Sequence, residues 1–311
     1  ADNLTTALVL AAVAMAVGKD NKNFIILSCI NIVVAANAGG AFSPFGDITT
    51  LMVWQKGVVP FVDFFALFLP SLVSWLIPAA AMSFALPKKR PPEIEEKAKI
   101  KKGGFVVAGL FVFTIIMTVS LHQLLHLPPF LGMMTGLGFL KLYGHFIRKH
   151  DLKTFTADMT ATGGKPFDIF ISLRRIEWDT MMFFYGVMLC VGGLGAMGYL
   201  HSLSSLLYAG MGDTAAHVLI GFISAIIDNI PVMFAVLNME ANHSLGQWLL
   251  VTLTAGIGGS LLSVGSAAGV ALMGQAQGTY TFMRHLKWAW AILLGYFAGI
   301  GTHLLINAEM F

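Results

Sequence analysis

Residues 37–50 place glycines, a proline and a carboxylate in the middle of a run that is apolar on both sides. The segment reads Asn37-Ala38-Gly39-Gly40-Ala41-Phe42-Ser43-Pro44-Phe45-Gly46-Asp47-Ile48-Thr49-Thr50, between the apolar stretches Phe24–Ala36 and Leu51–Trp54. If the whole run crosses a lipid bilayer, its polar centre lies at membrane depth, where non-helical backbone is tolerated only when protein buries it or a wet cavity accepts it. The pattern therefore predicts a broken helix with a site at the break.

Composition places the chain in the class of integral membrane proteins. Hydrophobic residues make up 57% of the sequence and charged residues only 11%, whereas roughly a quarter of the residues of soluble domains are charged. The stretch from Ala241 to Met283 has no Asp, Glu, Lys or Arg and is longer than the about 20 residues that a spanning helix needs. The formal charge of +3 comes from loop lysines and does not indicate a nucleic-acid partner. We expect an all-α polytopic membrane protein.

A second stretch repeats the design of the first. Gly39 and Gly40 align with Gly258 and Gly259 at an offset of 219 positions (258 − 39), which also brings Gly46 onto Gly265 and Asp47 onto Ser266. Upstream, Asp2-Asn3-Leu4-Thr5 has a counterpart in Asp228-Asn229-Ile230-Pro231. Paired interrupted hydrophobic segments in two halves of a membrane protein point to a transporter binding site near the midplane. We therefore expect two copies of one unit, each with a re-entrant hairpin and a broken transmembrane helix.

The hydropathy pattern divides the chain into four parts. Residues 1–86 form the C-terminal part of a first repeat, with a hairpin arm, the broken helix and one full span, and we expect its N-terminal part to precede residue 1. A basic loop follows at 87–102. Residues 103–200 form scaffold spans of a second repeat and contain another basic loop at 148–178, and residues 201–311 form the second hairpin, the second broken helix and a last span.

The distribution of Lys and Arg gives an orientation. Cytoplasmic loops carry an excess of these residues, so the loops at 87–102 and 148–178 are predicted to be cytoplasmic. The same rule places Lys22, Arg284 and Lys287 on the cytoplasmic face if one hairpin opens inward and the other outward. The two repeats are therefore predicted to be inverted.

Asp47 is the leading candidate for a functional side chain. An ionisable group inside a membrane is costly and is by default a functional hypothesis. The structural alternative is that Asp47 caps the half-helix that begins at Ile48, because aspartate accepts backbone N–H bonds and complements the helix dipole. The two roles are compatible.

The pairs Asp2-Asn3 and Asp228-Asn229 each put a carboxylate beside an amide at an expected hairpin tip. Hard cations prefer such oxygens, and an unwound tip also presents free backbone carbonyls. The alternative is an Asx turn that only reverses the chain. We predict an ion-binding and proton-binding site formed by Asp47, Asp2, Asn3, Asp228 and Asn229.

Several further residues accompany these candidates. Hydroxyl groups beside the breaks are secondary ligand candidates, although they could instead bond to their own helices. Prolines could act as simple kinks, and the glycines mark the backbone interruptions. The secondary ligand candidates are Asn37, Ser43, Thr5, Thr49, Ser263 and Ser266, and the backbone breaks are Gly39, Gly40, Pro44, Gly46, Gly258, Gly259, Gly265 and Pro231.

An enzymatic alternative rests on Gly210-Met211-Gly212-Asp213. This Gly-x-Gly-Asp pattern resembles a motif of intramembrane aspartyl proteases, but the partner Tyr-Asp pair is absent from the sequence. The pattern is short, and we expect the chain not to be an enzyme.

The motifs at residues 1–6, 37–50 and 228–231 resemble those of NhaD-type sodium/proton antiporters, which belong to the ion transporter superfamily with arsenite permeases and citrate or dicarboxylate carriers. The resemblance covers nearly the whole chain. It implies two inverted repeats, a mobile transport domain and a dimerising scaffold, with Asp47, Asp2, Asn3, Asp228 and Asn229 in the site and with Ser43 and Asn37 near it.

Together, the residues and the resemblance predict exchange of Na⁺ or Li⁺ for H⁺ across a bacterial inner membrane, with Na⁺ at the same site as the proton and with no cofactor or transition metal. The expected partners are these ions, the lipid bilayer and a second copy of the chain. A carboxylate in a poorly solvated site holds its proton because burial disfavours the charged form, and a bound cation reverses that preference. The alternative is a carrier of small anions such as arsenite or a dicarboxylate, because half-helix N-termini favour anions.

Overall fold

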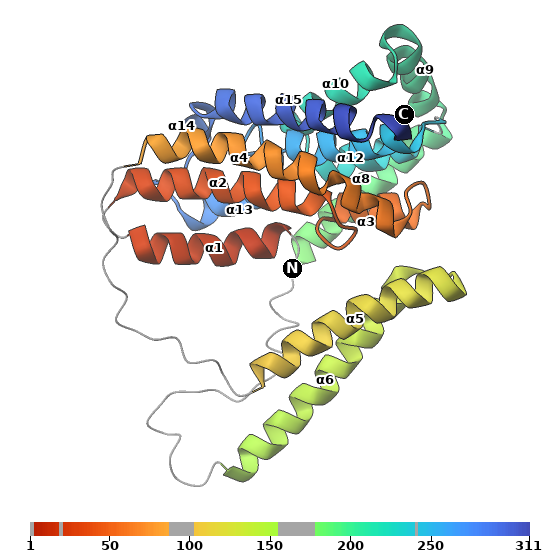
Figure 1. The fold of residues 1–311 in the computed structure, drawn as a ribbon. Helices are drawn as coiled ribbons and strands as arrows, with labels where there is room; N and C mark the ends of the chain where they lie inside the picture. The colour runs from red at the N-terminus through yellow and green to blue at the C-terminus, as the bar shows by residue number, and fades with distance from the viewer. Residues whose placement is uncertain (1–2, 19–20, 87–102, 155–177, 240–241) are drawn as a thin grey trace. The chain divides into compact units, whose positions relative to one another are not determined.

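The structure is a computed structural model that describes residues 3–18, 21–86, 103–154, 178–239 and 242–311. Every element of regular structure in these ranges is a helix. The chain divides into two compact units, residues 1–94 with 183–311, and residues 95–182, and Figure 1 shows the helices of each.

The first unit begins with two helices and an interruption. Helix α1 (Asn3–Gly18) packs against α2 (Lys22–Ala41), and a side-chain cap from Asn21 starts α2. The chain leaves the helical conformation after Ala41 and resumes it at α3 (Ile48–Gln55). Pro44 and Gly46 lie in this interruption, whereas Gly39 and Gly40, which were also predicted as backbone breaks, lie in the last turn of α2. Neither α1 nor α3 is long enough to span a bilayer, since about 20 residues are required.

A pair of long helices supports α2. The 3₁₀ helix η1 (Phe61–Leu67) leads into α4 (Phe68–Phe84), which packs on α2 and along α15 (Ala289–Ile306), as Figure 1 shows in orange and dark blue. Gly295 and Gly299 permit the close contact between α15 and α4, because a Cβ on Gly295 would lie 2.3 Å from the carbonyl oxygen of Ser74. Small residues of this kind allow helix backbones to approach in membranes.

The second half of the first unit repeats the pattern of short helices around an interruption. Helix α10 (Asp213–Ile226) packs along α12 (Leu245–Gly258), and α12 also packs against α2. Helix α11 (Asn229–Leu237) packs on α3. The chain is non-helical between the end of α12 and the start of α13, at residues 259–266. The bounds are α8 (Trp178–Ala196), α9 (Tyr199–Met211), α10 (Asp213–Ile226), α11 (Asn229–Leu237), α12 (Leu245–Gly258), α13 (Ala267–Gln275), α14 (Phe282–Leu286) and the 3₁₀ helix η2 (Ala308–Met310).

The second unit contains a helical hairpin. Helices α5 (Gly104–Leu125) and α6 (Pro129–Thr154) are joined by a short turn in which His126 has a left-handed backbone conformation. The two helices meet closely, because a Cβ on Gly136 would lie 2.2 Å from the side chain of Thr114. The side chains on the outer faces of α5 are mostly apolar and exposed.

Among the described residues, four helical segments have the length and hydropathy of membrane spans: Lys22–Ala41, Phe61–Phe84, Gly104–Leu125 and Ala289–Ile306. Helices α8 and α9 would add a fifth as a bent pair, with an angle of 78° between them. Helix α8 ends at Ala196, and the chain turns into α9 through Gly198, which has a left-handed backbone conformation. An all-helical polytopic membrane protein agrees with these features.

Candidate functional site

Asp47 lies at the junction between the interruption and α3. Its side chain is 4% exposed, and its Oδ1 accepts a 2.6 Å hydrogen bond from the backbone N–H of Ile48. Thr50 completes a capping box, since its Oγ1 accepts from the Asp47 N–H and its hydroxyl proton is shared between the carbonyl oxygens of Asp47 and of Ser43 in the interruption. The capping interpretation of Asp47 is therefore confirmed. Oδ1 of Asp47 accepts the bond of the cap, and Oδ2 accepts a bond from a different helix.

That second oxygen meets the other half of the chain. The side-chain amide of Asn229 donates a 2.9 Å hydrogen bond to Asp47 Oδ2. Asn229 is the first residue of α11 and is 1% exposed, and Asp228 before it is the N-cap residue of the same helix. The packing of α11 on α3 brings these residues together. Two of the predicted site segments thus form one buried cluster.

Asp228 contributes a second carboxylate to this cluster. It directly precedes Asn229, which is bonded to Asp47, so the two carboxylates lie in the same region of the fold. Its Oδ1 is buried and accepts no hydrogen bond from the residues that the structure describes. A buried carboxylate oxygen without a donor favours either a proton or a cation, because leaving it charged and unpaired is costly.

The two interruptions bring the same pair of positions into contact. A Cβ on Gly40 would lie 3.2 Å from the carbonyl oxygen of Gly46, and a Cβ on the corresponding Gly259 would lie 2.6 Å from the carbonyl oxygen of Gly265. These are corresponding pairs at the offset of 219 positions found in the sequence. At each break, the absence of side chains lets the returning chain touch the end of the preceding helix.

The residues after each break also correspond. Asp47 begins α3 with φ −144° and ψ 156°, and Ser266 begins α13 with φ −148° and ψ 148°. Both side chains cap the helix that follows, Ser266 by accepting a bond from the N–H of Gly269. One break therefore carries an ionisable cap where the other carries a neutral one, and this asymmetry concentrates the charge at Asp47.

A chain of side-chain hydrogen bonds joins the two breaks. Asn3 donates to Asn37 Oδ1 at 3.1 Å, and Asn37 Nδ2 donates to Ser260 Oγ at 2.8 Å. Asn37 and Ser260 are fully buried. The sequence predicts Asn3 in the site and Asn37 near it, and the structure connects both to the second interruption.

Two aromatic side chains that no sequence motif indicates, His285 and Tyr280, anchor the backbone of Ser260. A ring nitrogen of His285, Nε2, lies 2.8 Å from the Ser260 carbonyl oxygen, and its Nδ1 lies 2.7 Å from the hydroxyl of Tyr280. Both side chains are buried. Neither lies within a recognisable motif, so only the tertiary contact across 25 residues reveals this support.

The remaining candidates take different positions. Thr49 is buried beside the Asp47 carboxylate, Ser43 is half-buried and accepts from the Phe45 N–H, and Ser263 is buried with its hydroxyl 3.2 Å from the sulfur of Met273. Thr5 lies at an exposed position of α1. The remaining predicted ligand, Asp2, lies outside the described residues.

Both prolines lie where they do not disrupt a helix. Pro44 lies within the interruption, and Pro231 is in the first turn of α11. In a first helical turn the N–H has no intrahelical acceptor, so proline is tolerated there. The prolines therefore mark helix starts and breaks and do not kink a continuous helix.

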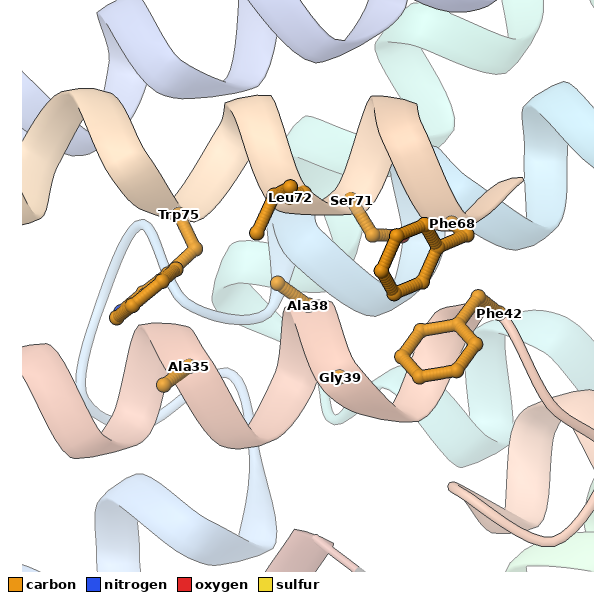
Figure 2. Close-up of a pocket in the computed structure, with 8 residues that line it drawn as sticks. All are labelled: Ala35, Ala38, Gly39, Phe42, Phe68, Ser71, Leu72 and Trp75. Carbon is orange, nitrogen blue, oxygen red and sulfur yellow. The ribbon is translucent and has the colours of Figure 1, made fainter. Parts of the chain in front are cut away.

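An apolar pocket lies beside the first break but contains none of the site carboxylates. It encloses about 250 Å³ between α2 and α4 and is lined by Ala35, Ala38, Gly39, Phe42, Phe68, Ser71, Leu72 and Trp75, as Figure 2 shows. Only Ser71 and the Trp75 indole bring polar atoms to it, and the indole donates to Asn31. The pocket is therefore not the location of the ion-binding candidates.

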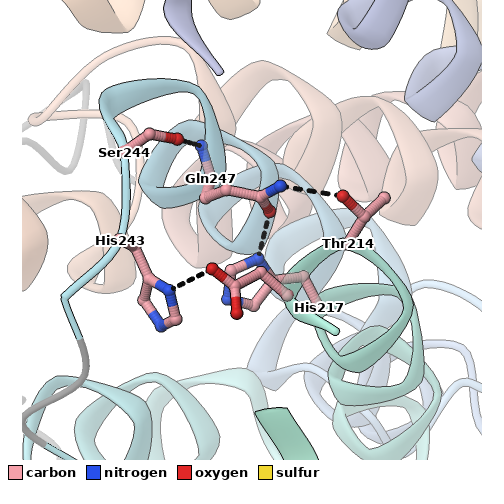
Figure 3. Close-up of polar contacts among 6 residues, drawn as sticks. Thr214, His217, His243, Ser244 and Gln247 are labelled. Carbon is pink, nitrogen blue, oxygen red and sulfur yellow. Dashed lines mark hydrogen bonds and ion pairs between the residues drawn. The ribbon is translucent and has the colours of Figure 1, made fainter. Parts of the chain in front are cut away.

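Asp213, the basis of the enzymatic alternative, belongs to a separate cluster where α10 and α12 begin. Its Oδ2 lies 3.1 Å from Nδ1 of His243. Nearby, Gln247 links the two helices by pairing with His217 at 2.9 Å and with Thr214 at 2.8 Å, as Figure 3 shows. Within the described residues, Asp213 therefore pairs with the imidazole of His243 beside this cluster.

Comparison with known proteins adds independent information. Residues 1–256 match the family described as "Citrate transporter". The chain is 56% identical to the Na⁺/H⁺ antiporter NhaD of Alkalimonas amylolytica over 100% of the chain and 67% of that protein. It is 54% identical to NhaD of Vibrio cholerae over 100% of the chain and 68% of that protein. It is also 32% identical to sodium/proton antiporter 1 of Arabidopsis thaliana over 98% of the chain and 53% of that protein.

Proposed function

The chain belongs to the family of NhaD Na⁺/H⁺ antiporters, and from that premise we propose that it exchanges Na⁺ or Li⁺ for H⁺ at the cluster around Asp47. The relatives are transporters, and the chain is not an enzyme. The observation that carries the proposal is the hydrogen bond between Asn229 and Asp47, because it joins the two half-chains at a buried carboxylate.

The chemistry of the cluster suits alternating occupation by a proton and a cation. The cluster holds the buried carboxylate of Asp47 and the half-buried carboxylate of Asp228, and two like charges there are unfavourable unless something neutralises them. A proton on one carboxylate satisfies this requirement. A Na⁺ or Li⁺ ion bound to the same oxygens satisfies it too, because hard cations prefer carboxylate and amide oxygens. The proton and the cation therefore compete, and this competition couples their movements.

Asn229 and the helix cap have positioning roles in this scheme. The N–H of Ile48 fixes Oδ1 of Asp47, and the amide of Asn229 fixes Oδ2. Asn229 also offers its carbonyl oxygen as a ligand. Asp2 is proposed as a further ligand of the ion, as the resemblance to the family implies.

Two inverted repeats with re-entrant hairpins are the proposed architecture. The matching glycine contacts at the two breaks support it, as do the matching caps Asp47 and Ser266. The helix contacts are reciprocal, since α1 of the first half packs on α13 of the second and α11 of the second packs on α3 of the first. In such an arrangement, each hairpin tip faces the break of the other repeat.

The remaining parts of the proposal concern the whole protein in its membrane. We propose a homodimer in a bacterial inner membrane, with the spans of residues 103–200 as the scaffold and the site-bearing helices as the mobile part. The loops at 87–102 and 148–178 are proposed to be cytoplasmic, as their basic residues favour.

A carrier of small anions is disfavoured by the helix caps. An anion would bind at free N–H groups of half-helices, but the Asp47 carboxylate already occupies the N-terminus of α3. The cluster also has no arginine, whereas it has two carboxylates within the described residues. Cation exchange suits this charge distribution better.

The direct test is proton flux in inverted membrane vesicles that contain the full-length protein and are energised to acidify the lumen. Addition of NaCl or LiCl is expected to alkalinise the lumen through the wild-type protein, as reported by a pH-sensitive dye. Asp47→Asn is expected to abolish the response, whereas Asp63→Asn, a half-buried aspartate of η1 outside the cluster, serves as a matched control and keeps it. Unchanged exchange in Asp47→Asn would exclude Asp47 as the carrier.

A further inference from the structure

A basic pocket lies where three membrane-length helices end together. It is lined by the start of α2, the end of α4, and the segment that joins α14 to α15. The lining residues are Lys22, Asn23, Ile26, Leu27, Ala85, Arg284, Lys287 and Trp288, and the pocket encloses about 400 Å³. Because helices of this length cross the apolar core of a bilayer, their shared end lies at the level of the lipid headgroups.

The charge of the pocket is entirely positive. Lys22, Arg284 and Lys287 line it, and the lining contains no Asp or Glu. Within the part of the chain that the structure describes, none of these three basic side chains forms an ion pair. Three like charges around one space repel one another, so a bound anion would stabilise this arrangement.

Arg284 is held in place for such contact. One guanidinium nitrogen, Nη1, donates to the carbonyl oxygen of Thr279, and the side chain is half-buried. The two lysines are exposed, at the first position of α2 and directly after α14. A fixed guanidinium with flexible ammonium groups around it is a common way to bind phosphate oxygens.

The floor and the rim of the pocket are apolar. Ile26 and Leu27 are buried beneath the charged groups. Neighbours in the sequence present large exposed apolar side chains, with Phe84 at 89% exposure and Met283 at 64%. Trp288 and Trp290 stack with their ring centroids 6.1 Å apart, and tryptophan is enriched at the membrane interface. The surroundings therefore suit a ligand with an anionic head and apolar chains.

We propose that this pocket binds the phosphodiester headgroup of an anionic membrane phospholipid, with Lys22, Arg284 and Lys287 around the phosphate and the acyl chains along the exposed apolar side chains. Basic pockets between transmembrane helices bind such headgroups in other membrane proteins, and the volume is in the range of small-molecule sites. The site is separate from the Asp47 cluster, and its existence does not depend on the proposed ion exchange.

The test is binding of defined lipids to the purified full-length protein, measured by native mass spectrometry and by thermal stabilisation. The probes are phosphatidylglycerol, cardiolipin, phosphatidylcholine and inorganic phosphate. Lys22→Gln combined with Lys287→Gln removes two charges from the pocket and leaves the Arg284–Thr279 contact intact. Lys56→Gln combined with Lys141→Gln is the matched control, because both residues are exposed and lie outside the pocket.

The wild-type protein and the control are expected to retain the anionic lipids in preference to phosphatidylcholine. The pocket variant is expected to bind the anionic lipids roughly thirtyfold more weakly and phosphatidylcholine equally well. Equal retention of anionic lipid by the pocket variant and the control would overturn the proposal. Stabilisation by inorganic phosphate as large as that by lipid would also overturn it, in favour of a soluble anion.

Discussion

The amide of Asn229 donates a 2.9 Å hydrogen bond to Oδ2 of Asp47, across 182 positions of the sequence. Both side chains are buried, and each belongs to a short helix that begins at the bond. A rearrangement that separates α3 from α11 must break this contact. The bond therefore ties the geometry of the carboxylate to the packing of the two halves.

Replacing Asn229 should lower the apparent affinity for Na⁺ more than it lowers the stability of the fold. Asn229→Ala removes the donor to Asp47 and leaves a buried oxygen unsatisfied, which costs about 1–3 kcal/mol. We expect the Na⁺ concentration for half-maximal exchange to rise roughly tenfold or more. Asn238→Ala is the control, since Asn238 lies directly after α11 and its side-chain amide donates to the carbonyl oxygen of Phe234 in the same helix. Equal half-maximal concentrations in the two variants would contradict the role of Asn229.

The bond between Asn37 and Ser260 should show energetic coupling. Each single change, Asn37→Ala or Ser260→Ala, leaves a buried polar group without a partner. It should lower the free energy of unfolding by about 1–3 kcal/mol. The double variant should lose less than the sum of the single losses, with an interaction energy of about 0.5–3 kcal/mol. The measurement is a thermal unfolding series of the purified protein. Additive losses would mean that the two residues do not interact in the membrane protein.

Neighbouring glycines should respond oppositely to alanine. A Cβ at position 46 would lie 2.6 Å from the Gly40 carbonyl oxygen and 2.8 Å from its Cα, so Gly46→Ala should force the break apart and abolish exchange. Gly39→Ala meets nothing within 4 Å, and alanine stabilises a helix by about 0.5–1 kcal/mol relative to glycine. Protein yield, thermal stability and vesicle exchange would be compared. A functional Gly46→Ala variant would show that the close contact is not required.

The cluster at the starts of α10 and α12 should be structural. Gln247→Leu removes the acceptor of His217 and the donor to Thr214 and should lower the free energy of unfolding by about 1–3 kcal/mol, because buried His217 and half-buried Thr214 lose their partner. Asp213→Ala should leave cation/proton exchange intact, since this aspartate pairs with His243 and is not bonded to the Asp47 cluster within the described residues. Loss of exchange in Asp213→Ala with unchanged stability would assign a transport role to this cluster.

Much of the first break could be predicted from local sequence. Gly40, Gly46 and Asp47 carry strong backbone preferences, and helix caps are local interactions over a few residues. The repeated spacing at Gly259 and Gly265 identified the second break in the same way. The membrane class followed from composition alone, because a bilayer imposes a simple requirement on apolar length.

The contacts between the halves could not be predicted in the same way. Asn37 and Ser260 are 223 positions apart, and neither residue type specifies a partner. The support of Ser260 by His285 and Tyr280 depends on the path of the chain after α13, and the turn between α8 and α9 depends on a single positive-φ glycine, Gly198. Such features arise from tertiary packing, which a hydropathy pattern does not encode.

The most direct test of the account measures protons released when Na⁺ binds to the purified full-length protein in weakly buffered solution. If the proton and the cation compete for the Asp47 cluster, adding NaCl should acidify the solution with the wild-type protein and with Asp63→Asn, and the response should be absent in Asp47→Asn. Proton release from Asp47→Asn equal to that of the wild-type protein would contradict the account.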